Sequence, residues 1–269
     1  MTHQRKASLP RRYIQLSSFL SHADQLELSR TVLLNAASVA DGVPPESALE
    51  HFAATVTRSD RKESLHLPTG LPYVGAPFAD VLPHAVRLAQ GALAAASASF
   101  RKRPDGRAAA CADGIAETAS DPCGLTGVCL LYGPRGKMAA HTDAPTRPGQ
   151  QQEWLVMLSV GETVMFSVAD RGGSEVLRIK SGDALVMDAM AVMHGVEGIE
   201  TDRNVRASEK FLPAAGLRLG VLLWRAAPPP SVKLVRTRSN EDDVFSEDED
   251  GSLDSMFNLF SEESSCSDT

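Results

Sequence analysis

The sequence lacks several features that would each assign it to a class of protein. Its 4 cysteines form no Cys-x-x-Cys pair, so reduced thiols are expected in place of a zinc site or a disulfide framework. No run of 18 or more apolar residues occurs, which argues against a spanning helix and a membrane partner. No internal repeat is visible either. A chain of 269 residues that is 43% hydrophobic is long enough to bury one sizeable core.

The first 12 residues have no apolar stretch of the secretory kind. An intracellular place in the nucleus or cytoplasm is therefore expected. The same residues are basic and free of acids, which leaves import into an organelle open. We expect residues 1–12 to be an extension that precedes the folded domain, and we expect the protein to be a monomer.

Residues 239–269 contain 11 acidic residues and no lysine or arginine. Removing those 11 from the 34 acidic residues leaves 23 against 27 basic ones, so the rest of the chain has a net charge of +4. The Ser-, Asp- and Glu-rich composition predicts a disordered tail over 229–269. Within it, the apolar island Leu253–Phe260 could bind a protein partner, and a solvated tail without a partner is the alternative.

Short apolar or alternating segments separated by turn signals predict a mainly β domain. The predicted strands are 128–132, 154–160, 163–168 (joined to the previous one by a tight turn at Gly161), 176–180, 184–188 and 218–225. Many short strands at regular spacing favour a double-stranded β-helix, or jelly roll. Helical patterns cover 24–40, 45–57 and 78–100. We expect these N-terminal helices to pack on the outside of the larger sheet, in a domain spanning 13–228.

His141-Thr142-Asp143 carries the most specific chemical signal. In an extended segment, side chains two residues apart point to the same side, so this imidazole and this carboxylate can converge on one ion. With His194 as a third ligand, two histidines and one carboxylate leave three positions of an octahedron open, which suits Fe(II) with a bidentate cosubstrate and O2. A structural zinc site would close those positions. His-x-Asp alone is weak evidence, because such pairs occur by chance.

A family resemblance strengthens this interpretation. Three segments carry it: Tyr132-Gly-Pro-Arg-Gly-Lys-Met-Ala-Ala-His141-Thr-Asp143, then Ser181-Gly-Asp-Ala-Leu-Val-Met-Asp188 running into His194-Gly-Val196, then Arg218-Leu-Gly-Val. Over residues 125–226 the chain resembles the AlkB-like branch of the Fe(II)/2-oxoglutarate dioxygenases, in the form found in plants and algae. The resemblance is thinner upstream, at Tyr13–Ser21 and Pro77–Pro83.

The resemblance implies a role for each matching residue. His141, Asp143 and His194 match the catalytic iron ligands, Arg218 matches the arginine that pairs with the distal carboxylate of 2-oxoglutarate, and Tyr132 matches a tyrosine that hydrogen-bonds the same cosubstrate. A planar guanidinium is well suited to bind a carboxylate. The implied reaction uses O2 to oxidise N-methyl groups on DNA or RNA bases, as in DNA repair and RNA demethylation. It releases formaldehyde, succinate and CO2.

The chain departs from the family pattern at several positions. Leu130 replaces an asparagine, and Pro145 replaces an acidic residue that helps some relatives to read the base. The second cosubstrate arginine is expected at Trp224, whereas Arg225 stands one place later. Strand alternation turns Arg225 away from the site unless a bulge intervenes, so a cosubstrate contact by Arg225 requires such a bulge.

Substrate contacts are predicted from two regions. His66 and Tyr73, in the segment where relatives place a substrate lid, could stack on a flipped or single-stranded base. Arg135 and Lys137, just before the iron motif, could contact phosphates, whereas the basic run 101–107 is expected to be a solvated loop. Two alternatives remain open: the same oxygenase chemistry on a protein or small molecule, and a jelly-roll binding module without catalysis.

Overall fold

The structure is a computed structural model that describes residues 11–40, 47, 50–52, 54–55, 64–71, 75–103, 106–121, 123–146, 150–171, 173–200, 211–213 and 216–227. All of them belong to one unit, Met1–Pro229. The predictions for the acidic tail, for Tyr73 and for most of the N-terminal extension lie outside the described residues. They stay predictions.

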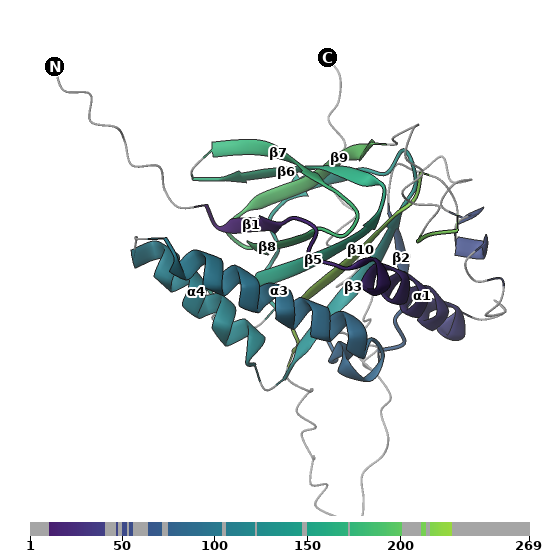
Figure 1. The fold of residues 1–269 in the computed structure, drawn as a ribbon, viewed down its shortest axis with the longest axis horizontal. Helices are drawn as coiled ribbons and strands as arrows, with labels where there is room; N and C mark the ends of the chain where they lie inside the picture. The colour runs from purple at the N-terminus through teal and green to yellow at the C-terminus, as the bar shows by residue number, and fades with distance from the viewer. Residues whose placement is uncertain are drawn as a thin grey trace, which may run out of the picture. The chain divides into compact units, whose positions relative to one another are not determined.

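Strands dominate the described residues and form two antiparallel sheets. The strands are β1 (Tyr13–Leu16), β2 (Leu65–Leu67), β3 (Leu125–Tyr132), β4 (Met138–His141), β5 (Trp154–Gly161), β6 (Thr163–Asp170), β7 (Gly173–Ile179), β8 (Ala184–Asp188), β9 (Met193–Glu200) and β10 (Arg218–Arg225). The major sheet has the order β1-β8-β5-β10-β3-β2, and the minor sheet has the order β4-β9-β6-β7. From β3 to β10 the chain passes repeatedly between the two sheets (Figure 1), which is the predicted jelly roll.

The turn after β5 shows how the chain changes sheets. The sequence pattern correctly predicts two strands on either side of Gly161, but these strands belong to different sheets and do not pair with each other. Gly161 has a φ of 99°, a conformation that favours glycine. A Cβ atom at this position would lie 2.5 Å from the carbonyl oxygen of Leu217. The crossover therefore requires a residue without a side chain.

Helices cover the outer face of the major sheet (Figure 1). They are α1 (His22–Val39), the short 3-10 helix η2 (Phe78–Asp80), α3 (Pro83–Arg101) and α4 (Gly106–Ala119). The sequence predicts α1 and α3 correctly, and a capping box between Ser21 and Asp24 begins α1. The sequence does not predict α4. The basic run 101–107 was expected to be a solvated loop, but its first residue belongs to α3 and its last two belong to α4. The helix predicted at 45–57 lies mostly outside the described residues. None of the described helices is long and apolar enough to span a membrane.

Two apolar clusters lie on opposite faces of the major sheet, and β10 contributes to both. Leu219, Val221 and Leu223 pack with the helices. Leu222 and Trp224 pack with residues of the minor sheet, such as Phe166. Because side chains alternate along a strand, Arg218 faces the space between the sheets, as Leu222 and Trp224 do. This intersheet space contains the candidate site.

Candidate metal centre

Three predicted ligands converge at one end of the intersheet space. His141 ends β4 and is paired directly with His194 on β9, and their ring centroids are 4.5 Å apart. The Asp143 Oδ1 atom lies 3.5 Å from His141 Nε2 and 3.7 Å from His194 Nε2. Adjacent ligands of a metal with bonds near 2.1 Å are about 3 Å apart, so small movements would complete a site. In the described part of the chain, no other group of three His, Cys, Asp or Glu side chains has its ligand atoms within 4.8 Å of one another.

Both imidazoles are oriented by their own strands. The Nδ1 atom of His141 lies 2.9 Å from the carbonyl oxygen of Ala139, and that of His194 lies 2.9 Å from the carbonyl oxygen of Val192. Because a carbonyl oxygen only accepts hydrogen bonds, each Nδ1 carries a proton and donates it. In the neutral rings both Nε2 lone pairs then face Asp143. This is the tautomer that metal-binding histidines require.

The two histidines differ in environment. His194 is buried, and the ring of Phe166 stacks against it with centroids 6.0 Å apart. Burial lowers the pKa of His194, so the ring is held neutral and able to bind a metal. His141 is only partly buried, and its hydrogen bond with Asp143 raises its pKa. A metal ion bound by the three residues would take the place of the proton that a protonated His141 shares with Asp143.

Asp143 is placed by a contact from a distant part of the chain. Its backbone N–H donates to the carbonyl oxygen of Ala189 at 2.9 Å, which joins the loop after β4 to the turn after β8. Thr142, between the two ligands, is exposed. The predicted alternation of the His-x-Asp segment is therefore present, and a long-range hydrogen bond fixes it.

Arg218 is a buried cation that has no counter-ion among the residues described by the structure. It is 1% exposed, and its Nη2 atom donates to Ser159 Oγ at 3.2 Å. Its Nε atom has no hydrogen-bond partner, and no carboxylate among the described residues pairs with it. Burial lowers the pKa of Arg218 to about 10, so the side chain stays charged at neutral pH. A buried charge is costly unless it is paired, and an anionic ligand would pair it.

Tyr132, which the resemblance assigns to the same cosubstrate, lies beside Arg218. The two residues are opposite each other in the β3–β10 pair, and the guanidinium carbon lies 5.8 Å from the centre of the Tyr132 ring. Burial raises the pKa of Tyr132, so the phenol keeps its proton. Its hydroxyl lies 3.8 Å from the sulfur of Met138, which begins the strand that ends at His141. Arg218, Tyr132 and the histidines therefore lie on the inner faces of the two sheets.

Arg225 is not brought to this space. The register of β10 on β3 is continuous from Arg218 to Arg225, so the bulge that a cosubstrate contact requires is absent from this strand pair. Alternation places Arg225 on the helix side of the sheet. Its guanidinium donates to Glu117 Oε1 at 3.2 Å and lies 3.7 Å from Asp121. Trp224 occupies the inner face.

Replacing Arg225 with methionine is expected to leave 2-oxoglutarate affinity unchanged. The Glu117 side chain is exposed, but Asp121 is mostly buried, so losing both ion pairs should lower the free energy of unfolding by about 1 to 3 kcal/mol. Calorimetric titration of 2-oxoglutarate and urea unfolding measure the two quantities separately. A rise in the 2-oxoglutarate Kd would show that Arg225 contributes to cosubstrate binding.

The other described residues predicted to bind substrate are not part of the metal group. His66 is exposed on β2 and paired with Leu130, so it is on the intersheet face of the major sheet. Arg135 and Lys137 are exposed in the turn that leads into β4. Sequence reasoning missed Ser159, whose hydroxyl contacts Arg218. The signal was present, because Ser159 is the one polar residue in the run 154–160.

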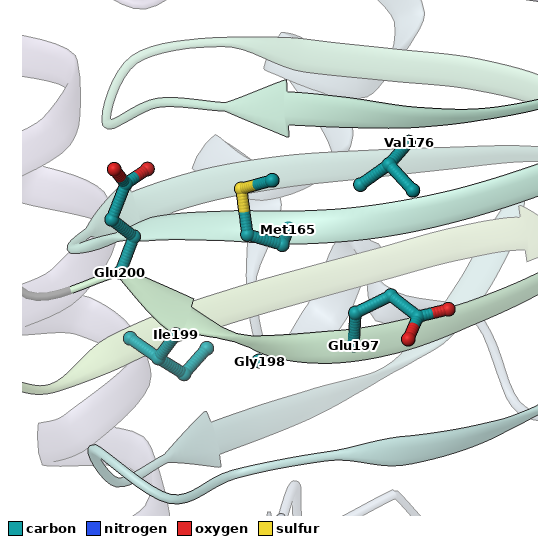
Figure 2. A pocket seen from close by; sticks show the side chains of 6 residues that line it. All are labelled: Met165, Val176, Glu197, Gly198, Ile199 and Glu200. Carbon is teal, nitrogen blue, oxygen red and sulfur yellow. The ribbon is translucent and has the colours of Figure 1, made fainter.

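A separate hollow of about 420 Å³ lies on the outer face of the minor sheet (Figure 2). It is lined by Met165, Val176, Glu197, Gly198, Ile199 and Glu200. Their neighbours Phe166 and Val196 point into the intersheet cluster, so the hollow opens on the side away from the ligands. Glu200 at its edge is already paired with Arg178 at 2.7 Å. None of the predicted site residues lines it.

No family model matches this sequence, and no curated protein matches it. Several solved structures are distantly similar. The structure of OsALKBH1 has a TM-score of 0.46 at 17% identity, covering 81% of this chain and 98% of that one. HygX from Streptomyces hygroscopicus, with nickel and 2-oxoglutarate bound, has a TM-score of 0.41 at 12% identity, covering 80% and 82%. A Pseudomonas putida prolyl-4-hydroxylase has a TM-score of 0.38 at 14% identity, covering 81% and 94%.

Proposed function

We propose that this protein is an Fe(II)- and 2-oxoglutarate-dependent dioxygenase. The observation that carries the proposal is the combination, between the two sheets, of an open three-ligand group and a buried arginine that pairs with no carboxylate among the described residues. Two neutral imidazoles and one carboxylate suit Fe(II) and leave three positions for other ligands. A cosubstrate that binds a metal at one end and carries a free carboxylate at the other would use both features.

Each residue then has a defined task. His141, Asp143 and His194 would hold Fe(II), and Arg218 would bind the distal carboxylate of 2-oxoglutarate while Ser159 orients the guanidinium. Iron with 2-oxoglutarate and O2 supplies the oxidising chemistry and converts the keto acid to succinate and CO2. The apolar intersheet cluster around these residues limits access of bulk water, which strengthens the charge pairing.

The substrate class proposed is an N-methylated base in DNA or RNA. Hydroxylation of the methyl group gives a hemiaminal, which breaks down to formaldehyde and the bare nitrogen. The similarity of residues 132–143, 181–196 and 218–221 to the AlkB-like motifs supports this choice. So do the exposed Arg135 and Lys137, because their turn leads directly into the strand that carries His141, where a phosphate backbone would pass.

Anaerobic loading with Fe(II) and 2-oxoglutarate, followed by air and a panel of methylated DNA and RNA oligonucleotides, tests the proposal. We expect succinate and formaldehyde in equal amounts with at least one methylated oligonucleotide, and no formaldehyde with its unmethylated counterpart. Succinate without formaldehyde across the whole panel would contradict nucleic-acid demethylation and point to a protein or small-molecule substrate. If neither product formed, nucleic-acid demethylation would be contradicted as well.

A further inference from the structure

Two buried carboxylates, Glu153 and Asp188, hydrogen-bond to the loops that carry the metal ligands without being ligands themselves. Glu153 is 2% exposed and Asp188 is 0% exposed. The backbone N–H of Glu153 donates to Asp188 Oδ1 at 3.2 Å, and the N–H of Ala189 donates to the carbonyl oxygen of Glu153 at 2.8 Å. Burial raises the pKa of both carboxyl groups. A fold retains such costly groups where their hydrogen bonds hold a specific geometry.

Glu153 closes the loop that begins at Asp143. Its Oε2 atom accepts a hydrogen bond from Thr146 Oγ1 at 2.7 Å and another from Gln150 Nε2. Its Oε1 atom accepts from the backbone N–H of Arg225 at 3.4 Å. Thr146 follows the aspartate ligand by three residues, and Glu153 immediately precedes β5. The Glu153 side chain therefore anchors the loop after Asp143 to the start of β5.

Asp188 organises the turn that leads to His194. The backbone N–H groups of Met190 and Ala191 face its carboxylate, and its own carbonyl oxygen accepts from Val192 N at 2.9 Å. The carbonyl oxygen of Val192 in turn accepts from Nδ1 of His194. On the outer side, Arg12 Nη1 lies 3.0 Å from Asp188 Oδ2. The carboxylate thus connects the histidine-bearing turn to the N-terminal strand.

The two loops are also joined by the hydrogen bond from Asp143 N to Ala189 O. We propose that Glu153 and Asp188 are positioning residues of the metal site: each holds one ligand-bearing loop, and their mutual hydrogen bond fixes the two loops against each other. This inference rests on the proposed function, since it concerns the same ligands. Outer groups that orient metal ligands commonly affect metal affinity by about 10- to 100-fold.

The hydrogen-bond pattern requires a carboxylate at position 153. Both oxygens of Glu153 accept, and Gln150 Nε2 offers only protons. In Glu153→Gln, the new amide NH2 group must face either the Gln150 donor or the Arg225 N–H, so one hydrogen bond is lost without a change of size. Asp188→Asn creates the same conflict with the N–H groups that surround it.

A titration with Co(II), followed by its visible absorption, tests the proposal on the full chain. Glu153→Gln and Asp188→Asn are expected to raise the Kd for Co(II) by about 10- to 100-fold and to alter the spectrum. Thr146→Val, an exposed substitution that removes one donor to Glu153, should raise it by a smaller factor. The matched control is Glu162→Gln: Glu162 is also buried, but at the far end of β5, where it accepts from Gly216 N. It should leave the Kd unchanged.

Two results would overturn the proposal: wild-type Co(II) affinity in both carboxylate variants, or an equal loss in Glu162→Gln, which would reveal a general loss of stability. If the unaltered chain bound no Co(II), the proposed metal function would fail on its own. Amide hydrogen exchange of the metal-free proteins then decides the positioning role. Glu153→Gln should speed exchange over 142–146, 150–152 and 189–193 relative to Glu162→Gln, and equal exchange in the two variants would refute it.

Discussion

His141→Ala is expected to abolish turnover while leaving the fold intact. The substitution removes one of three ligands and leaves Asp143 and His194, which are too few to hold Fe(II) firmly. The imidazole is only partly buried and lies at the end of β4. Its loss should therefore change the free energy of unfolding by less than about 1 kcal/mol. Succinate release measures turnover, Co(II) absorption measures metal binding, and urea unfolding measures stability.

Thr142→Ala is the matched control for this experiment. Thr142 is adjacent to both ligands and exposed, and its side chain faces away from the metal group. It should keep full metal binding and turnover. Retained turnover in His141→Ala would remove the iron assignment altogether, and loss of activity in both variants would point to disruption of the loop.

Arg218→Met should have opposite effects on cosubstrate affinity and on stability. Removing the guanidinium leaves the distal carboxylate of 2-oxoglutarate without its partner, which typically costs 2 to 5 kcal/mol, or a rise in Kd of about 30-fold or more. The lowered pKa of Arg218 means that the folded state disfavours the charged form. Methionine removes that buried, unpaired charge, so we expect the metal-free protein to gain about 1 to 4 kcal/mol in the free energy of unfolding.

Arg178→Met provides the comparison for Arg218. Arg178 is exposed on β7 and forms an ion pair with Glu200 outside the intersheet space. Its loss should change stability by less than about 1 kcal/mol and leave 2-oxoglutarate affinity unaltered. Calorimetry with Co(II) in place of iron measures the affinity, and urea unfolding measures the stability. An unchanged 2-oxoglutarate Kd in Arg218→Met would contradict the cosubstrate assignment.

Local patterns predicted most of the jelly roll and the residues that meet at the candidate metal centre. The apolar run 218–225 has the same bounds as β10, because a strand buried on both faces leaves a continuous apolar signal. Alternation along that strand also predicted that Arg218 and Arg225 face opposite sides. The His-x-Asp spacing pointed to two of the three converging side chains, and the resemblance to AlkB-like proteins pointed to His194, Tyr132 and Arg218.

Features that depend on distant contacts could not be predicted. Helix α4 was missed because its pattern is interrupted by Gly114, which weakens a helix. A Cβ atom there would lie 2.6 Å from Gln152 Nε2 and 2.8 Å from Trp154 Nε1, so the glycine reflects packing against β5. Glu153 and Asp188 read as ordinary acidic residues, since nothing local shows that both are buried and joined.

The pairing of His141 with His194 joins strands that are far apart in the sequence. In an unfolded chain the two imidazoles are separated by a long loop, whose closure has an entropic cost. Metal binding to this pair therefore selects folded molecules and shifts the folding equilibrium toward them. A chelator would act on this protein as a mild denaturant, and the melting temperature would depend on the concentration of free divalent metal.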